Sequence, residues 1–299
     1  MEQEWQQLNE QVVSLLKTAR QQVLQKMQEP LTVAAKSNRK DLVTNIDKSN
    51  EQFLIAGIRR IDPTARVLGE EGFGDALTDL KGRVWIVDPI DGTMNFVKQH
   101  DHFAMMIGIY QDGVGQLGYI YDVMNDILYA GGPQLGGVWA NERQLTAPTD
   151  LALSEGLIGA SGPLVIHDIA HMQAIVHASA GMRVYGSAGI EMIHILEGKS
   201  LGYISHLKPW DIAAGKILLE TLGVQVSTID GRPLDMLSSN LVLVATKKAQ
   251  RDILQIEEDD VSLWPLSQFF YAAGRYGWTL PAIDATISVL TEVSAPWSI

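Results

Sequence analysis

The sequence contains no cysteine among its 299 residues. Disulfide bonds, cysteine nucleophiles and zinc sites built from thiolates are therefore excluded. It also lacks an apolar run of about 18 residues, the length that a membrane-spanning helix needs. Its first residues are acidic and polar, unlike a secretory signal peptide. These absences predict a cytoplasmic protein that does not associate with a membrane.

Basic residues are scarce: 23 Lys and Arg stand against 35 Asp and Glu, which gives a formal net charge of −12. Such a surface repels polyanions, so nucleic acid is not expected as a partner. If the protein handles phosphate esters, metal ions must accompany them, because carboxylates alone would repel the substrate. The composition, 46% hydrophobic and 19% charged, is that of a globular chain.

The first half of the chain combines two amphipathic helices with a series of strands. Apolar residues at steps of three and four predict helices over 3–28 and 48–61. Asp112-Gly113 is a strong hairpin turn signal between two of the strands that follow. This half therefore predicts an antiparallel sheet covered by the early helices. Its strands are expected at 84–87, 103–110, 114–121 and 127–130.

Beyond the polar segment 146–150 the pattern changes to short strands that alternate with helices, which is typical of α/β layering. We place a boundary there and expect one unit over 1–147 and a second over 148–255. Residues 256–299 form an aromatic-rich C-terminal extension with no clear period and no assigned role. The strands and helices expected in the second unit are 157–160, 183–185, 201–204 and 241–245, and 169–180, 190–197 and 212–222, respectively.

The most informative segment follows an apolar strand that brings Asp88 to its C-terminal end. Pro89 is expected to end the strand and Asp91-Gly92 to form a turn, after which Thr93 is expected to cap a short helix. Two carboxylates three residues apart at a bend can converge on one space, and Mg²⁺ prefers oxygen ligands. The N–H groups of Gly92 and Thr93, beside a helix start, suit a phosphate oxygen.

A strand-ending turn explains this segment as well as a metal site does when the segment is taken alone. Glu70 and Glu71 add two acids in a glycine-flanked loop just before the strand, and crowded like charges are unfavourable without a cation. Asp211, in a Trp-Asp pair, stands at a predicted helix start, and so does Asp47. A simple N-cap is the alternative role for both.

Together these segments resemble the inositol monophosphatase family of lithium-sensitive, magnesium-dependent phosphatases. The resemblance covers roughly residues 5–250, in the family's order and at its spacing. It implies a layered αβαβα sandwich of the sugar-phosphatase type, in the α+β or α/β class, and a homodimer. The residues that carry it are Lys36, Asp41-Leu42-Val43-Thr44, Asp47, Gly69-Glu70-Glu71, the run from Asp88 to Phe96, and Trp210-Asp211.

The resemblance also implies a role for each residue of the site, with Mg²⁺ as cofactor. Asp47 and Thr93 would orient the attacking water, and Glu70 would help as a base. The unit over 1–147 would carry most metal ligands, and the unit over 148–255 would carry Asp211 and the substrate pocket. The implied metal ligands are Glu70, Asp88, the carbonyl of Ile90, Asp91 and Asp211. The implied substrate and phosphate contacts are Asp91, Gly92, Thr93, Gly186, Ser187, Ala188 and Asp211.

The expected function is Mg²⁺-dependent hydrolysis of a small phosphate monoester, inositol monophosphate-like or a sugar phosphate, by metal-activated water. Family members that select inositol carry an acid seven positions before the Asp of Trp-Asp, where this chain has Ile204. The 2′-phosphate of NADP and fructose 1,6-bisphosphate are alternative substrates on the same scaffold. A non-catalytic protein that binds a metal or ligand is an alternative of another class.

Overall fold

The structure is a computed structural model that describes residues 2–36 and 42–258. Met1–Leu254 forms one compact unit, which holds both of the larger β-sheets. The predicted boundary segment 146–150 lies between strand β9 (Arg143–Gln144) and the short helix η1 (Leu153–Glu155), and the division there stays a prediction. Most of the predicted extension over 256–299 lies outside the described residues, as does Asp41.

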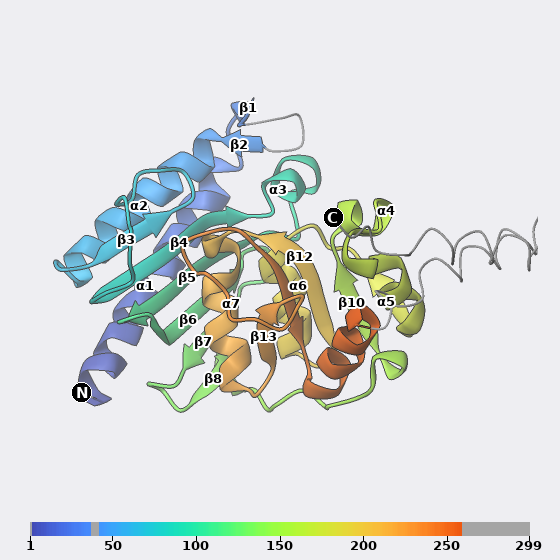
Figure 1. The fold of residues 1–299 in the computed structure, drawn as a ribbon. Coiled ribbons are helices and arrows are strands. Elements are labelled where there is room, and N and C mark those ends of the chain that lie inside the picture. The colour runs from blue at the N-terminus through green and yellow to red at the C-terminus, as the bar shows by residue number, and fades with distance from the viewer. Residues whose placement is uncertain (1, 37–41, 259–299) are drawn as a thin grey trace, which may run out of the picture. The chain divides into compact units, whose positions relative to one another are not determined.

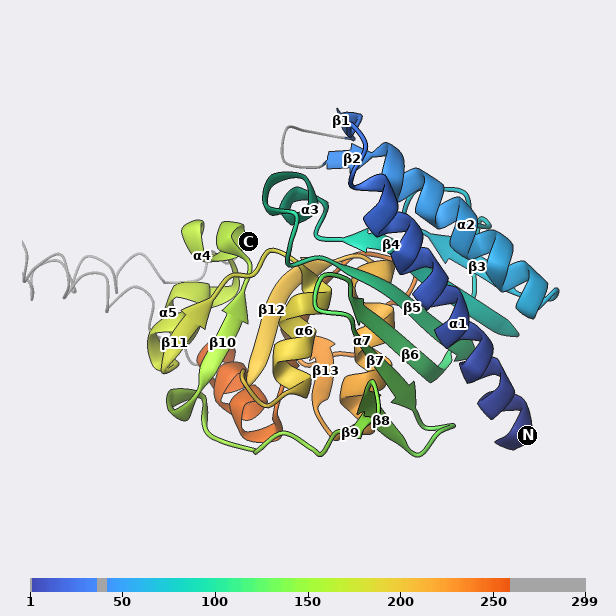
Figure 2. The same ribbon diagram turned by 180° about the vertical axis from the view of Figure 1, so that it is seen from behind.

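The elements are stacked in layers (Figure 1, Figure 2). Helices α1 and α2 cover one face of a large sheet, α6 and α7 lie between the large and the small sheet, and α4 and α5 lie beyond the small one. This confirms the expected layered fold. The α-helices are α1 (Glu2–Lys26), α2 (Asn45–Ile61), α3 (Thr93–Gln99), α4 (Gly162–Ile166), α5 (Met172–Ala178), α6 (Ala188–Leu196) and α7 (Pro209–Thr221). A short helix η2 (Ile169–His171) precedes α5, and residues 247–258 are also helical.

The large sheet has the strand order β3-β4-β5-β6-β7-β8-β9. Its neighbours are antiparallel, as predicted, except that β3 and β4 run parallel. The predicted strands correspond to β4–β7, whereas β3, β8 and β9 were not predicted. The bounds are β3 (Arg66–Gly69), β4 (Arg83–Asp91), β5 (Ala104–Gln111), β6 (Val114–Asp122), β7 (Ile127–Gly132) and β8 (Gly137–Ala140).

The small sheet is mixed, with the order β11-β10-β12-β14-β13. Its strand β13 was not predicted, because its sequence is too polar to stand out from a loop. Ahead of both sheets, β1 (Val33–Ala35) and β2 (Leu42–Thr44) form an antiparallel pair. The bounds in the small sheet are β10 (Leu157–Ala160), β11 (Gly181–Arg183), β12 (Gly202–Leu207), β13 (Gln225–Thr228) and β14 (Asn240–Ala245).

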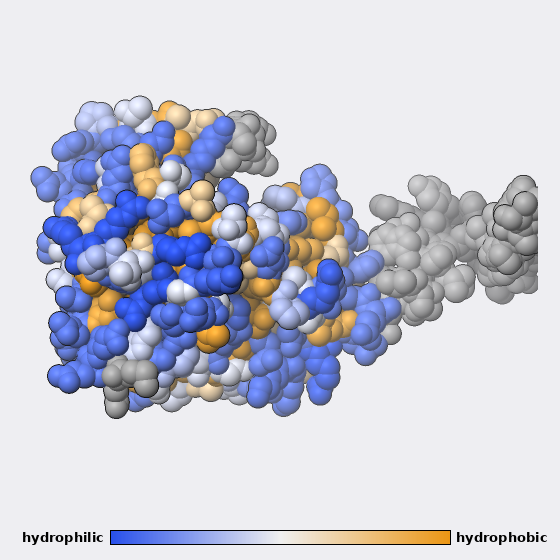
Figure 3. All heavy atoms as spheres, turned by 60° about the vertical axis from the view of Figure 1, so that its left-hand side comes forward, coloured by the Kyte–Doolittle hydropathy of each residue, from blue (hydrophilic) through white to orange (hydrophobic). Residues whose placement is uncertain are grey.

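Two apolar cores hold the layers together. The first lies between α1, α2 and the large sheet, where the predicted stripe of α1, including Val12, Leu16 and Val23, is buried. The second surrounds α6 and α7, which pack against both sheets. Among the described helices none is both long and apolar enough to cross a membrane. The face drawn in Figure 3 is mainly hydrophilic with small hydrophobic patches.

Two glycines let α7 approach the large sheet closely. A Cβ at Gly118 of β6 would lie 2.4 Å from the carbonyl oxygen of Ala214, and one at Gly108 of β5 would lie 3.0 Å from the Cβ of Ala213. The hydroxyl of Tyr110 donates a hydrogen bond to the carbonyl of Ala213 at 2.9 Å. These contacts fix the height of α7 above the sheet, and with it the position of the first turn of α7.

We expect Gly118→Ala to lower the free energy of unfolding by about 1–3 kcal/mol, because the added methyl group collides with helix backbone that cannot rotate away. Urea denaturation followed by circular dichroism measures this. Val114→Ala on the same strand is the control, since Val114 is 62% exposed, and we expect it to cost no more than about 1 kcal/mol. Equal losses in the two variants would contradict the close approach.

Candidate active site

Strand β4 carries two carboxylates across an irregularity in its pairing with β5. Asp88 and Asp91, three residues apart, face β5 residues that are two apart, so β4 contains an extra residue. The strand therefore continues past Pro89 to Asp91. The prediction that Pro89 ends the strand is wrong, because a bulge absorbs the proline, which has no N–H to donate.

Asp88, Asp91 and Asp211 each place a carboxylate oxygen within 4.8 Å of the others. Asp211 lies in the first turn of α7, where its carboxylate accepts a hydrogen bond from the N–H of Lys208 at 2.8 Å. The N-cap is thus Lys208, three residues earlier, so the alternative role of Asp211 as a simple N-cap is wrong. A set of hard oxygen donors of this kind suits Mg²⁺, Mn²⁺ or Ca²⁺.

One cavity, of about 210 Å³, gathers these carboxylates with the other predicted metal ligands. Its walls come from β4, from the start of α3 and α7, and from the loops after β3 and before α6. Every predicted metal ligand lines it, although those residues are far apart in the sequence. The lining residues are Leu42, Glu70, Asp88, Ile90, Asp91, Gly92, Thr93, Met94, Gly186 and Asp211.

Burial makes the charged forms of these carboxylates unfavourable without a cation. Burial, and then the negative charge of the neighbouring carboxylates, raises the pKa of Asp88 well above its ordinary value. Burial likewise raises the pKa of Asp211 to about 7, and the charges of Asp91 and Glu70 add to this effect. A divalent cation would reverse this balance by favouring the ionised forms.

Glu70 lies in a loop that is held by two groups outside the cavity. The ammonium of Lys36 lies 2.8 Å from Glu70 Oε1 and 2.5 Å from Glu71 Oε1. The buried carboxylate of Glu51 accepts backbone N–H groups of the same loop, from Glu71 at 2.6 Å and from Phe73 at 2.9 Å. Burial raises the pKa of Glu70, while the Lys36 ammonium opposes that rise.

Helix α2 presents three buried polar side chains to the site, at positions i, i+3 and i+4. Asp47 accepts a hydrogen bond from the Thr93 hydroxyl at 2.9 Å. Asn50 donates to the carbonyl of Pro89 at 2.8 Å, which supports the bulge, and Glu51 holds the Glu70 loop. Asn50 and Glu51 were missed from the sequence. Their spacing with Asp47 on one helix face was the available signal.

The start of α2 also differs from prediction. The helix begins at Asn45, three residues early, and Thr44 is its N-cap. Asp47 is therefore not the N-cap. Instead it accepts the backbone N–H of Thr44 at 3.0 Å and the Thr44 hydroxyl, which completes a capping box. Burial raises the pKa of Asp47, although these hydrogen bonds favour its ionised form.

Thr93 is the first residue of α3 and not its cap, so that prediction is also wrong. The N-cap is Gly92, whose φ of 88° favours glycine and which makes no side-chain capping bond. A Cβ at Gly92 would lie 2.8 Å from the Cβ of Ser187. The hydroxyl of Thr93 is thereby left for Asp47 Oδ1, and it also lies 3.2 Å from the carbonyl oxygen of Ile90.

The predicted substrate segment Gly186-Ser187-Ala188 contacts Asp91 directly. Asp91 accepts the backbone N–H groups of Ala188 at 3.1 Å and Gly189 at 2.8 Å, as well as the Ser187 hydroxyl. These groups form the first turn of α6, where partial positive charge stabilises an anion. Gly186 lines the carboxylate cavity, whereas Ser187 and Ala188 line a second cavity beside it.

The second cavity, of about 370 Å³, shares Asp91, Gly186 and Asp211 with the first. It lies between the end of β10, β12 and the start of α6. Ile204, whose replacement of an acid bears on substrate choice, lines neither cavity and is fully buried. The remaining residues that line the second cavity are Ala160, Ser161, Gly162, Pro163, Val184, Ser187, Ala188, Glu191, Tyr203, Ser205 and Leu207.

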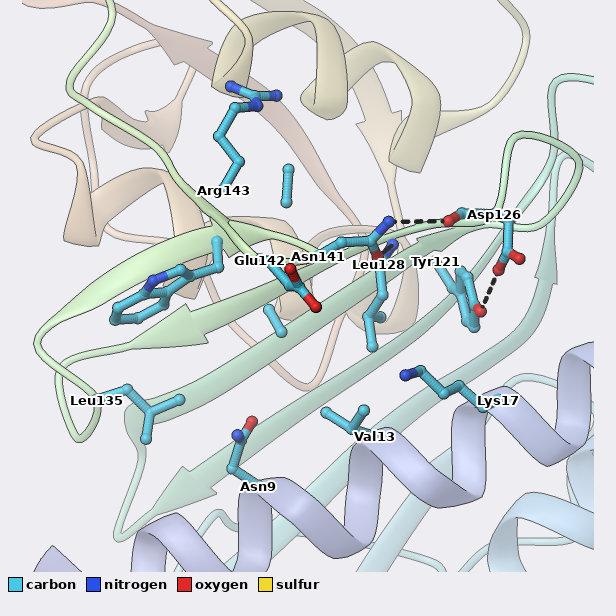
Figure 4. A pocket seen from close by; sticks show the side chains of 13 residues that line it. Asn9, Val13, Lys17, Tyr121, Asp126, Leu128, Leu135, Asn141, Glu142 and Arg143 are labelled. Carbon is cyan, nitrogen blue, oxygen red and sulfur yellow. Dashed lines mark hydrogen bonds between the residues drawn. The ribbon is translucent and has the colours of Figure 1, made fainter.

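A larger cavity, of about 750 Å³, lies apart from this chemistry, between α1 and the strands β6–β8. In Figure 4, Asn9, Val13 and Lys17 of α1 face it from one side, opposite Leu128 and Leu135. None of the predicted site residues lines it. The smaller pair of cavities is therefore the candidate active site.

Residues 4–261 match the model of the inositol monophosphatase family. The inositol-1-monophosphatase of Bacillus subtilis strain 168 is 39% identical over 256 residues, which cover 84% of this chain and 96% of that protein. The fructose-1,6-bisphosphatase/inositol-1-monophosphatase of Thermotoga maritima is 29% identical over 213 residues, which cover 70% of this chain and 80% of that protein. A crystal structure of an IMPase/NADP phosphatase complexed with Mg²⁺ and phosphate is similar to this chain with a TM-score of 0.78 and 30% sequence identity. The match covers 84% of this chain and 95% of that one.

For the metal-free protein we expect the free energy of unfolding to fall as the pH rises from about 4 to about 7. The pKa of Asp211 is raised from 3.8 to about 7 on folding, so the native state binds more protons than the unfolded state across that window. Urea denaturation in EDTA at several pH values measures the slope.

Asp211→Asn should make this slope shallower, and excess Mg²⁺ should restore stability at pH 7 through binding to the native state. A parent protein that becomes more stable between pH 5 and 7 in EDTA would contradict the crowding of buried carboxyl groups.

Proposed function

We propose that this chain, which belongs to the inositol monophosphatase family and is a phosphoric monoester hydrolase, uses Mg²⁺ to hydrolyse small phosphorylated polyols. The observation that carries the proposal is the convergence of Asp88, Asp91 and Asp211 within 4.8 Å. They converge in a cavity that also exposes Glu70 and Thr93. Carboxylates at this density suit a divalent cation, and such a cation is what a phosphate ester needs in an acidic protein.

The donor chemistry of the cavity fits Mg²⁺. Its proposed ligands are all oxygens, with no histidine or cysteine among them, and this favours Mg²⁺ over zinc. When bound, the metal supplies Lewis-acid stabilisation of the phosphate oxygens and lowers the pKa of coordinated water. The proposed ligands are Glu70, Asp88, the carbonyl of Ile90, Asp91 and Asp211.

Thr93 and Asp47 are proposed to hold the attacking water. The Thr93 hydroxyl donates a hydrogen bond to Asp47 at 2.9 Å, so its oxygen lone pairs stay available to accept a hydrogen bond from water. Because α3 starts at Thr93 and α2 fixes Asp47, both groups are set by the backbone before substrate arrives. This preorganisation favours one direction of attack on phosphorus.

The reaction joins the water oxygen to phosphorus and breaks the bond from phosphorus to the ester oxygen. The ester oxygen takes up a proton, in balance with the proton that the attacking water loses, and leaves as an alcohol. Glu70 lines the cavity and is proposed to help remove the proton of the attacking water. The backbone N–H groups of Gly92 and Thr93 are proposed to bind phosphate oxygens. Gly186 and Asp211, which line both cavities, would lie where the phosphate meets the alcohol.

A small polyol monophosphate is the favoured substrate over NADP and fructose 1,6-bisphosphate. The two adjoining cavities, of about 210 and 370 Å³, are compact for ligand sites. A non-catalytic role is not favoured, because every predicted metal ligand lines the cavity and Asp47 and Thr93 are hydrogen-bonded beside it. Family membership alone supports three further proposals: inhibition by lithium, a homodimer and a cytoplasmic location.

Asp88→Asn should reduce Mg²⁺-dependent phosphate release from inositol 1-phosphate by at least about 100-fold, because one anionic ligand is lost from the cation. The variant should stay folded, since it removes a charge that its neighbours repel. Asp230→Asn is the matched control: Asp230 is exposed, and among the described residues its side chain pairs with its sequence neighbours Thr228 and Arg232. Turnover of the Asp88 variant at the parental rate would refute the assignment.

In a panel of inositol 1-phosphate, fructose 1,6-bisphosphate and NADP, we expect kcat/KM to be highest for inositol 1-phosphate and at least about tenfold lower for NADP. A polyol ring fits within the two adjoining cavities, whereas most of the nucleotide would extend beyond the residues that line them. Steady-state phosphate release with Mg²⁺ makes this comparison. A preference for NADP would show that the alcohol part binds elsewhere.

A further inference from the structure

The cavity beside the carboxylate cluster contains an acid that the hydrolytic chemistry does not use. Glu191, in the first turn of α6, is 2% exposed and lines this second cavity. It is not one of the clustered carboxylates around the proposed cation. A buried carboxyl group is costly unless hydrogen bonds or charges compensate it, so its place on the wall of a cavity needs an explanation.

Glu191 is only partly satisfied by the protein. Among the described residues its side chain has one hydrogen bond, from the backbone N–H of Tyr185 to Oε1 at 2.7 Å. A carboxylate has about four lone-pair directions, so most of its capacity to accept hydrogen bonds is unused. Burial accordingly raises the pKa of Glu191 to about 7. The group is suited to accept hydrogen bonds from a molecule in the cavity.

The surroundings of Glu191 are shaped to hold this carboxyl group. A Cβ at Gly159 of β10 would lie 2.3 Å from Glu191 Oε2, so glycine at that position leaves the space that the oxygen occupies. The hydroxyl-bearing residues Ser161 and Ser205 line the same cavity, as does Tyr203. The cavity therefore offers several polar groups on one side and opens to Asp91 and Asp211 on the other.

We infer that Glu191 is a specificity-determining residue, which accepts a hydrogen bond from a hydroxyl group on the alcohol part of the substrate. It would select phosphate esters of polyols against esters of similar size that lack hydroxyl groups. The inference rests on the proposed function, because it takes the phosphate to lie at the carboxylate cluster and the alcohol part to extend into the second cavity.

Glu191 of α6 would supply the acidic contact to the alcohol that Ile204 of β12 cannot supply. Ile204 of β12 has no polar side-chain atom and lines neither cavity, whereas its neighbours Tyr203 and Ser205 line the second one. Glu191 reaches that cavity from the helix packed against β12. The absence of an acid at position 204 therefore leaves a polyol ester acceptable, because the hydrogen-bond acceptor is supplied from another element.

A purely positioning role for Glu191 gives a different result on mutation. If the side chain served only to hold the Tyr185 backbone, Glu191→Gln would keep that bond, since the amide oxygen accepts it equally well. Any remaining defect would affect all esters alike. A specificity role instead lowers turnover of hydroxylated esters selectively, because a buried group that pairs with a substrate hydroxyl discriminates against the analogue without it.

The test compares inositol 1-phosphate with cyclohexyl phosphate, which has the same ring without the hydroxyl groups. Both are assayed with Mg²⁺ for the parent, Glu191→Gln, and Glu191→Met, which fills the space but accepts no comparable hydrogen bond. We expect kcat/KM for inositol 1-phosphate to fall about 10- to 100-fold in the Met variant and less in the Gln variant. For cyclohexyl phosphate it should stay within about threefold of the parent.

Glu197→Gln is the matched control, because Glu197 follows the same helix but pairs with Arg143 and Tyr129 outside the cavity. It should leave both esters unaffected. Equal losses for both esters in the Glu191 variants, or no loss for either, would overturn the specificity role while the parent still hydrolyses both. A parent that releases phosphate from neither ester would overturn the proposed function and this inference together.

Discussion

The site depends on the repulsion between carboxylates that the fold forces into one buried space. Asp88, Asp91 and Asp211 would separate or stay protonated if nothing compensated their charge. Backbone N–H groups at helix starts supply part of that compensation. Asp91 accepts hydrogen bonds from the N–H groups of Ala188 and Gly189 in the first turn of α6, and Asp211 accepts one from the N–H of Lys208 at the start of α7. The remaining negative charge is what makes the cavity selective for a cation.

This compensation explains why the layers are arranged as they are. The bulge in β4 places two carboxylates at the C-terminal end of that strand, and the first turns of α6 and α7 meet them there. Gly108 and Gly118 let α7 lie close to the sheet, so that Asp211 reaches the cluster. The groups proposed for the chemistry come mostly from the large sheet and α2, whereas the second cavity is built by the small sheet and α6. Substitutions at residues that line only the second cavity can therefore change substrate choice, whereas Asp91, Gly186 and Asp211 line both cavities.

The sequence predicted much of this site, because its acids sit in short segments with recognisable spacing. The strand that ends next to Asp88 and the helix that begins next to Asp211 were predicted from apolar segments, and the layered fold followed from the family resemblance. The ends of strands and the capping residues of helices were harder to predict from the sequence. Pro89 and Thr93 obeyed tertiary constraints that outweighed their usual preferences, since a bulge absorbed the proline and Gly92 took the cap position.

Other features left no local signal at all. The N–H groups of Ala188 and Gly189 bind Asp91 through the backbone, so their residue types do not mark the contact. Glu191 looks like an ordinary helix residue until the small sheet places it on a cavity wall. Asn50 and Glu51 were within reach of sequence reasoning, because with Asp47 they form a polar stripe on a helix that otherwise buries apolar residues.

The central claim is that a divalent cation is held by the carboxylates of β4 and α7. Anomalous diffraction from crystals soaked in Mn²⁺, which accepts the same oxygen ligands as Mg²⁺, tests it most directly. The account predicts an anomalous peak in contact with Asp88, Asp91 and Asp211. Crystals in which Mn²⁺ binds only at other surfaces, with these carboxylates left free of metal, would contradict it.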